Sequence, residues 1–244
     1  MSIKIDNISF SYGGNKLALN KVSLSASKGS FTGLLGPNGA GKSTLYALLT
    51  RLYKLQSGDI TIGDLGIQKH PREVMRNLGV VFQQSTLDLD LSVRQNLDYH
   101  AALHGISPKQ AGQAVEEELA RIDMLDRQND KVRTLNGGHR RRLEIARALI
   151  HQPSVLLLDE ATVGLDPQTR QSLNAHVRKL CQDKALTVLW ATHLIDELQS
   201  SDPVYILHQG QVKASGLSSA ICAEHQAPDL QTAFAKLTKK ETAS

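Results

Sequence analysis

The residues with the clearest chemistry lie in one short stretch, 36–44, which reads Gly-Pro-Asn-Gly-Ala-Gly-Lys-Ser-Thr. It matches the pattern G-x-x-x-x-G-K-[ST] of phosphate-binding loops. Its glycines let the backbone curl so that several N–H groups point at one phosphate, and a following helix N-terminus adds partial positive charge. Lys42 can reach the β- and γ-phosphates and Ser43 can ligate Mg²⁺. We expect the nucleotide to be held by residues of this stretch, namely Gly36, Asn38, Gly39, Gly41, Lys42, Ser43 and Thr44.

Two elements must position this loop. Residues 31–35 are short and mostly apolar, as expected of a buried strand. Residues 42–55 place leucines at helical spacing, at positions 45, 48, 49 and 52. The loop is therefore predicted between a strand and a helix, which is the setting that the motif needs. The alternative is a glycine-rich turn that matches the pattern by chance.

A second candidate for chemistry follows another apolar run. Residues 155–158 read Val-Leu-Leu-Leu and precede Asp159 and Glu160. Phosphoryl transfer needs a metal, an oriented water and charge stabilisation. Asp159 fits the acid that supports Mg²⁺, and Glu160 is placed to polarise an attacking water. Two acids here could also simply end a strand or cap a helix, but the phosphate loop and the acid pair support each other.

The rest of the chain alternates between strand and helix patterns. Residues 1–35 predict a small antiparallel sheet, and residues 84–152 are nearly all helical, with a helix at 92–104 that Ser92 caps. Continuous apolar strands between helices imply a parallel core sheet that helices cover on both faces. A hairpin is expected to close at Gln209-Gly210. Residues 218–244 form a weakly patterned tail with one last helix, and 239–244 are expected to be frayed.

Composition narrows the class of protein. The chain has 244 residues, a formal net charge of +4 and two cysteines, Cys181 and Cys222, without metal or redox spacing. Two reduced thiols in a cytosolic protein are the default for such usage. No apolar run reaches the ~18 residues of a membrane span, and the first residues lack the apolar core of a signal peptide. The scattered basic residues and low aromatic content argue against a nucleic-acid partner.

At this point the chain resembles the ATP-binding cassette family, the motor subunits of membrane transporters, over residues 3–217. The most diagnostic piece is 135–139, Leu-Asn-Gly-Gly-His, which is similar to the family signature L-S-G-G-Q at a helix start. The resemblance implies a P-loop NTPase fold with a RecA-like α/β core and an N-terminal antiparallel β-subdomain. It places the nucleotide-binding domain at 1–217, with a helical subdomain at 84–152 inserted in the core and a helical tail at 218–244.

The resemblance also assigns roles in a dimer. In this family two copies face each other head to tail, and each ATP lies between the phosphate loop of one copy and the signature of the other. Asn136, Gly137 and Gly138 would therefore meet the γ-phosphate bound to the partner. Asn136 replaces the usual Ser of the signature and still offers an amide N–H to a phosphate oxygen. His139 replaces the usual Gln. The resemblance therefore does not predict the rate of hydrolysis. For Arg141 and Arg142, which follow the signature, we expect a solvated basic face.

Four further residues match family positions. Gln83 would touch Mg²⁺ and sense a membrane partner, Tyr12 would stack on adenine, His193 would contact the γ-phosphate and Asp166 would cross the dimer. Each has a plainer alternative: an exposed loop amide, a strand tyrosine, a histidine after a strand and a helix N-cap, respectively.

The resulting hypothesis is an ATPase subunit that uses ATP and Mg²⁺ and powers a membrane transporter. It would lie in the cytoplasm, peripheral on the inner (plasma) membrane through a permease that is a separate chain. Residues 87–97 resemble the matching stretch of export-type subunits, including the sodium and drug exporter-like group. The variant signature at 135–139 resembles the subunits associated with quinoprotein alcohol dehydrogenase systems. The alternatives are a soluble cassette ATPase that acts on ribosomes or DNA and a degenerate cassette that does not hydrolyse ATP.

Overall fold

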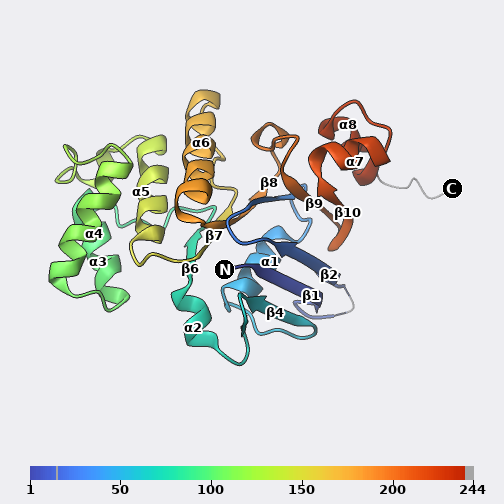
Figure 1. The fold of residues 1–244 in the computed structure, drawn as a ribbon, viewed down its shortest axis with the longest axis horizontal. Helices are drawn as coiled ribbons and strands as arrows, with labels where there is room; N and C mark the ends of the chain where they lie inside the picture. The colour runs from blue at the N-terminus through green and yellow to red at the C-terminus, as the bar shows by residue number, and fades with distance from the viewer. Residues whose placement is uncertain (15, 240–244) are drawn as a thin grey trace.

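Six strands form the central sheet of the molecule, in the order β10-β9-β3-β8-β7-β6 (Figure 1). The structure is a computed structural model that describes residues 1–14 and 16–239. Each pair from β9 to β6 is parallel, and only β10 runs antiparallel, beside β9. The strands of this sheet are β3 (Phe31–Leu35), β6 (Leu78–Val81), β7 (Val155–Asp159), β8 (Thr187–Thr192), β9 (Pro203–His208) and β10 (Gln211–Leu217).

The inner strands β3, β7 and β8 are buried along their whole lengths. This burial explains why they read as continuous apolar runs instead of alternating ones. The predicted parallel core sheet is therefore confirmed, and so is the hairpin at Gln209-Gly210, which joins β9 to β10. The predicted α/β P-loop fold is confirmed as well.

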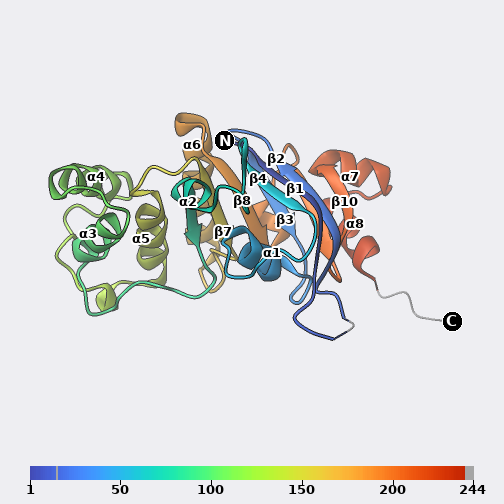
Figure 2. The same ribbon diagram turned by 90° about the horizontal axis from the view of Figure 1, so that it is seen from below.

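A second, antiparallel sheet covers one side of the molecule, in the order β2-β1-β4-β5. Its alternating burial matches its alternating sequence. Helix α1 shares one apolar core with both sheets, because Leu45 and Leu48 lie in the same cluster as Ile5 and Leu157 (Figure 2). The elements are β1 (Ile3–Phe10), β2 (Leu19–Ala26), β4 (Asp59–Ile62), β5 (Leu65–Gly66), α1 (Lys42–Leu49) and α2 (Pro71–Arg76).

The opposite face of the central sheet is covered by α5 (Gly137–Leu149) and α6 (Pro167–Lys184). Ile145 of α5 and Val177 of α6 belong to the same core cluster as Leu156 and Trp190. Both faces of the sheet are thus covered, as the sequence predicts. The candidate functional residues lie at the carboxyl ends of three parallel strands. Residues 36–44 follow β3, residue 83 lies shortly after β6, and 159–160 lie at the end of β7.

Helices α3 (Val93–Leu103) and α4 (Pro108–Arg121) lie with α5 at one end of the molecule (Figure 1). They have a core of their own, which includes Leu97, Leu119 and Leu143. Ser92 caps α3 in a full capping box with Gln95, so the predicted start of this helix is confirmed.

Some boundaries differ from the predictions. The helix expected over 42–55 ends at Leu49, and Leu52 beyond it is 66% exposed instead of buried. After β8, the segment Ile195–Glu197 is a 3₁₀ turn. The segment Val132–Thr134 is also a 3₁₀ turn.

The chain after the hairpin forms two helices instead of one. The expected last helix is α8 (Leu230–Thr238), and α7 (Ser218–Glu224) was not predicted because it buries only one large apolar side chain, Ile221. The expectation of fraying over 239–244 concerns mostly 240–244, which lie outside the described residues. The division into domains at 1–217 and 218–244 stays a prediction. Among residues 1–14 and 16–239, no helix combines the length and the hydropathy needed to cross a bilayer.

Candidate active site

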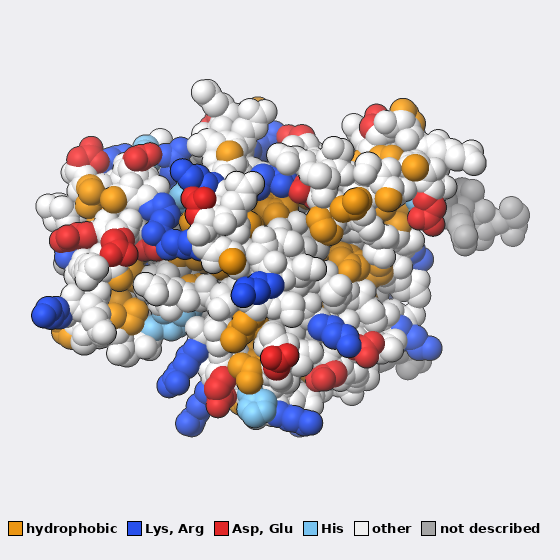
Figure 3. Space-filling view, in the orientation of Figure 1, with side chains coloured by type: hydrophobic (Ala, Val, Ile, Leu, Met, Phe, Trp, Pro, Cys, Tyr) orange, Lys and Arg blue, Asp and Glu red, His pale blue; other side chains and the backbone are white. Residues whose placement is uncertain are grey.

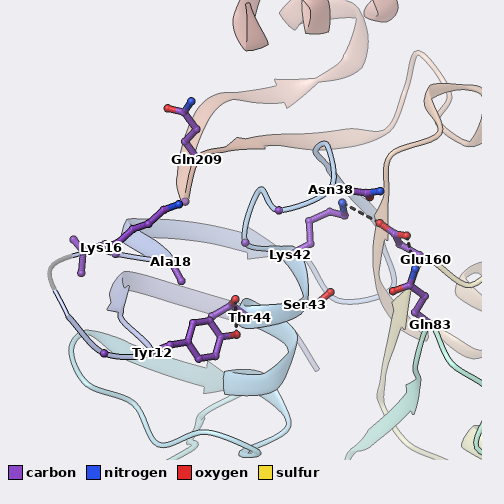
Figure 4. A pocket seen from close by; sticks show the side chains of 15 residues that line it. Tyr12, Lys16, Ala18, Asn38, Lys42, Ser43, Thr44, Gln83, Glu160 and Gln209 are labelled. Atoms are coloured by element: carbon purple, nitrogen blue, oxygen red, sulfur yellow. Dashed lines mark hydrogen bonds and ion pairs between the residues drawn. The ribbon is translucent and has the colours of Figure 1, made fainter. Parts of the chain in front are cut away.

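A cleft of about 930 Å³ opens above the loop that precedes α1 (Figure 4). It receives side chains from the turn after β1, the phosphate loop and the segments that follow β6 and β7, which the fold brings together at one edge of the central sheet. Nine of the predicted site residues line it: Tyr12, Asn38, Gly39, Gly41, Lys42, Ser43, Thr44, Gln83 and Glu160.

The glycines of the loop have geometric reasons to be glycine. Gly39 and Gly41 adopt φ values of +79° and +112°, which side chains of L-residues rarely allow. A Cβ on Gly36 would lie 2.5 Å from the carbonyl oxygen of Leu207, and one on Gly41 would lie 2.9 Å from that of Ala18. The loop is therefore pressed against the neighbouring backbone, and its curled shape leaves the N-terminus of α1 open to the cleft.

Lys42 is the first residue of α1, and its ammonium group is fully engaged. Nζ donates hydrogen bonds to the carbonyl oxygens of Gly36, at 2.7 Å, and Pro37, at 3.1 Å. It also lies 3.0 Å from Oε1 of Glu160, in an ion pair with both side chains less than 10% exposed. A phosphate that enters the cleft must therefore compete with Glu160 for this cation.

Glu160 directly follows β7 and is held in an uncommon backbone conformation. Its φ is +48°, and its backbone N–H donates to the carbonyl of Ala191 at 2.9 Å. The side-chain amide of Gln83 donates to Oε2 at 3.1 Å. Nδ1 of His193 lies 3.3 Å from Oε1 but makes no hydrogen bond within the described part of the chain. Three predicted site residues thus converge on one carboxylate.

The pKa of Glu160 reflects two opposing effects. Burial alone would raise it, but the hydrogen bond and charge of Lys42, together with His193, hold the pKa of this carboxyl below its usual value. The carboxylate is therefore ionised at neutral pH. Because Lys42 supplies most of the opposing effect, its departure toward a phosphate would raise the pKa and make Glu160 a stronger base.

Asp159, the last residue of β7, is 4% exposed. Burial raises the pKa of its carboxyl, and the nearby Ser43 hydroxyl partly opposes that shift. Its Oδ1 is buried without a hydrogen-bond partner among the residues that the structure describes. A buried carboxylate oxygen with no partner, beside a hydroxyl, fits the oxygen ligands that Mg²⁺ prefers.

Tyr12 projects from the end of β1 into the cleft, with 62% of its surface exposed. Its hydroxyl hydrogen-bonds Oγ1 of Thr44 at 2.9 Å. Phe10 and Tyr53 pack against the ring at centroid distances of 5.1 and 5.4 Å, both nearly perpendicular to it. The ring is thus fixed at the cleft while its surface stays accessible, and its stacking on adenine stays a prediction.

The β9–β10 hairpin forms a side of the cleft that the sequence did not predict. Gln209 and Gly210 line the cleft together with Lys16, and Lys16 points toward Gln209 (Figure 4). The N–H of Gly210 donates to the carbonyl of Ala40 in the loop at 2.9 Å. No local pattern joins residues so far apart in sequence, because their proximity comes from the parallel pairing of β3 with β9.

The signature residues lie elsewhere. Asn136 caps α5, and its side-chain oxygen accepts from the N–H of His139 at 2.8 Å. A Cβ on Gly138 would lie 2.7 Å from Cγ2 of Thr169, and Asp166 accepts from the N–H of the same threonine at 3.0 Å as the cap of α6. Asn136, Gly137, Gly138 and Asp166 therefore form a second cluster, which we call the signature cluster. None of its residues lines the cleft.

Arg141 corrects one expectation. It is 8% exposed and not part of a solvated basic face. Its guanidinium donates to the carbonyl oxygens of Phe82, at 2.8 Å, and Gln83, at 2.9 Å, and pairs with Glu144 at 2.6 Å. It therefore fixes the backbone that carries Gln83. Because these two carbonyl partners lie far from Arg141 in sequence, no local pattern predicts the arrangement. Arg142, by contrast, is partly exposed and bonds only Ser172 among the described residues.

Comparison with known proteins decides the family. The family model for ABC transporters matches residues 19–163, more than half of the 244 residues. The chain belongs to the ABC transporter family. It binds ATP and hydrolyses it, as the ATPases of this family do.

Two relatives of this ABC ATPase match it over more of the chain than residues 19–163. The linearmycin resistance ATP-binding protein LnrL of Bacillus subtilis (strain 168) is 34% identical over 91% of this chain and 71% of the relative. A Nod factor export ATP-binding protein I of Burkholderia orbicola (strain AU 1054) is 38% identical over 85% of this chain and 68% of the relative.

Solved structures give the same fold. The ATP-binding cassette MJ0796, a dimer bound to ADP and Pi in a post-hydrolysis state, matches with a TM-score of 0.77 and 26% identity. That match covers 88% of this chain and 98% of the other. cbiO1 of Clostridium perfringens, part of the transporter complex cbiONQ, matches with a TM-score of 0.82 and 27% identity, over 91% and 90% of the two chains.

Proposed function

We propose that this ABC ATPase powers an exporter through composite sites, each formed by the cleft of one copy and the signature cluster of a second copy. The observation that carries the proposal is the separation of the two clusters within one chain. The cleft gathers Lys42, Gln83 and Glu160, with His193 against the Glu160 carboxylate, while the signature cluster lies outside it. A helix N-terminus capped by Asn136, with two glycines in its first turn, suits an anion that another molecule presents.

Each residue of the cleft then has its own role in the binding and hydrolysis of ATP. Lys42 moves from Glu160 to the phosphates, and Glu160 accepts the proton of the attacking water. Gln83 and His193, which both lie against the Glu160 carboxylate, keep that water aligned. The aromatic ring of Tyr12 takes the adenine base. Ser43, Asp159 and Gln83 would hold Mg²⁺, which supplies charge neutralisation of the phosphates when it is bound.

The transport role is inferred from the relatives. Their names describe antibiotic resistance and Nod factor export, and cbiO1 is one component of a larger transporter complex. By analogy, the membrane part is a separate permease chain, and this chain lies on the cytoplasmic face of the membrane. The insert formed by α3, α4 and α5, with the loop after Gln83, is the proposed docking surface, because Arg141 joins that loop to α5.

Co-purification tests the transport role. The chain is expressed at native level with a removable tag and recovered from detergent-solubilised membranes with ATP present. A polytopic membrane protein in the eluate, together with ATP turnover of the assembled complex that exceeds that of the isolated chain, is the expected result. Ribosomes or DNA in the eluate, with no membrane protein, would overturn the proposal in favour of the alternative class.

A further inference from the structure

Three histidines outside the ATP cleft meet where the helical insert contacts the central sheet. His100 lies on α3, His104 caps the C-terminal end of that helix one turn later, and His151 follows the C-terminal end of α5. One ring nitrogen from each lies within 4.8 Å of the others. His104 is exposed and the other two are half-buried, so the cluster reaches the solvent. Histidine side chains are visible at the surface of this end of the molecule in Figure 3. None of these residues lines the ATP cleft.

The ring of His151 is oriented by the sheet. Its Nε2 lies 3.1 Å from the carbonyl oxygen of Leu78 in β6. Because a carbonyl can only accept, Nε2 carries the proton, and Nδ1 carries the lone pair. Nδ1 is buried and has no hydrogen-bond partner among the described residues. In metal sites the second ring nitrogen of a ligating histidine almost always donates in this way to a carbonyl or carboxylate.

The other two rings lie beside that of His151, but His104 must turn before all three rings can direct a nitrogen at one ion. The rings of His104 and His151 are stacked, with centroids 3.8 Å apart and planes 9° apart, and the centroid of His100 lies 4.8 Å from that of His104.

We propose that His100, His104 and His151 bind one divalent transition-metal ion, with Zn²⁺ as the best fit, and that water fills the fourth position. Three imidazoles suit zinc, whose bonds to nitrogen are ~2.0–2.1 Å long. Ligands at tetrahedral angles then lie about 3.4 Å apart, so the nitrogens must approach one another from their present spread. His104 is exposed, and rotation of its side chain can bring about that approach.

The surroundings set the affinity. Arg147 is the cation beside His100, and its guanidinium is directed to the carbonyl and hydroxyl of Thr86. Its positive charge opposes a bound cation, so an affinity on the order of micromolar is expected rather than that of a structural zinc centre. A bound ion would connect α3 of the insert to β6 of the central sheet through His151 and Leu78. It would therefore restrain α3 relative to the central sheet.

Calorimetric titration with Zn²⁺ alone tests the site, on the full chain without tag or nucleotide. One ion per chain is expected, and His104→Ala should abolish that binding. Because His104 is exposed, this variant should fold normally. His225→Ala, which removes a histidine of the tail, is the matched control and should leave binding unchanged. With Zn²⁺ at about 100 times its Kd, Tm should rise by roughly 5–10 °C in the parent chain but not in His104→Ala.

Co²⁺ serves as a spectroscopic probe of the same site. The parent chain should show the intense visible absorption of tetrahedral Co²⁺, and His104→Ala should lose it. Absence of saturable Zn²⁺ binding overturns the proposal. Zn²⁺ binding that His104→Ala leaves intact also overturns it, because the ion would then lie elsewhere, for instance at Glu160 and His193. Neither result depends on ATP turnover or on a permease, so the site can fail while the proposed function stands.

Discussion

Nζ of Lys42 lies 3.0 Å from Oε1 of Glu160, so the cation expected to bind phosphate is paired with the carboxylate expected to activate water. The pair is buried, and Lys42 is the main group that keeps Glu160 ionised against its burial. Binding of ATP must therefore break the pair. The same event that places Lys42 on the phosphates makes the carboxylate more basic, which links substrate binding to activation of the water.

Replacement of Lys42 by alanine removes one side of this exchange. Lys42→Ala should weaken ATP binding by about 10- to 100-fold, because charge-assisted hydrogen bonds to the phosphates are lost. Calorimetry with ATP measures the change. Lys54→Ala removes an exposed lysine and should bind ATP like the parent chain. Equal affinity of Lys42→Ala and Lys54→Ala would refute the role of Lys42.

Replacement of Glu160 by glutamine should separate binding from hydrolysis. Glu160→Gln keeps the shape of the side chain but cannot accept the proton, so turnover should fall by about 10²- to 10⁴-fold. ATP should stay bound and hold two chains together, as a dimer on size-exclusion chromatography. The control, Glu73→Gln, changes an exposed carboxylate on α2. A monomeric Glu160→Gln chain that hydrolyses ATP at the parent rate would show that another group is the base.

Asp159 is expected to contribute to function at the expense of stability. Burial raises the pKa of its carboxyl, and one oxygen has no partner in the described structure, so the ionised form destabilises the nucleotide-free chain. Asp159→Asn removes this buried charge and should raise Tm at pH 7 by about 2–4 °C, which corresponds to about 1 kcal/mol in a chain of this length. The same variant should abolish Mg²⁺-dependent turnover.

The pH dependence of this gain follows from the sign of the shift. A carboxyl whose pKa is raised on folding costs stability above the folded-state value and regains it as the pH falls through that value. The Tm difference between Asp159→Asn and the parent chain should therefore shrink as the pH is lowered toward the acidic range. A difference that grows on acidification would contradict the assignment. Thermal unfolding monitored by circular dichroism at several pH values measures it.

Arg141 offers a stability prediction with a close control. Arg141→Ala leaves the buried carboxylate of Glu144 without its cation and frees the carbonyls of Phe82 and Gln83. Loss of one partner of a buried pair costs about 3 kcal/mol, or roughly 10 °C in Tm for a chain of this size. Arg142→Ala, one residue along the same helix, should change the free energy of unfolding by less than ~0.5 kcal/mol. Similar losses in the two variants would mean that the burial of Arg141 has no energetic consequence.

Only part of the site can be predicted from local sequence patterns. The phosphate loop, the acids after β7 and the caps of α3 and α6 are predictable because each depends on residues within a few positions. Arg141 and Gly210 act through partners brought close by sheet pairing and helix packing, so neither has a local signal. The site roles that need a second copy remain predictions, since one chain contains only the two separate halves.

Asn136 tests the composite site directly. Asp and Ser both cap helices about as well as Asn, so Asn136→Asp and Asn136→Ser should keep Tm close to that of the parent chain. Only the aspartate places a negative charge where the partner's γ-phosphate is expected. Asn136→Asp should therefore lose turnover and the ATP-dependent dimer seen with Glu160→Gln, while Asn136→Ser keeps both.

Mixing completes the Asn136 test. A head-to-tail pair of Asn136→Asp and Lys42→Ala has one site with both changes and one site with neither. At ATP concentrations that leave the Lys42→Ala site empty, neither variant alone should turn over ATP. Equal amounts of the two variants should then recover about a quarter of the parent turnover, because half of the pairs are mixed and each mixed pair has one intact site of two. Turnover that stays at zero on mixing, although both variants are folded, would mean that each chain completes its own site.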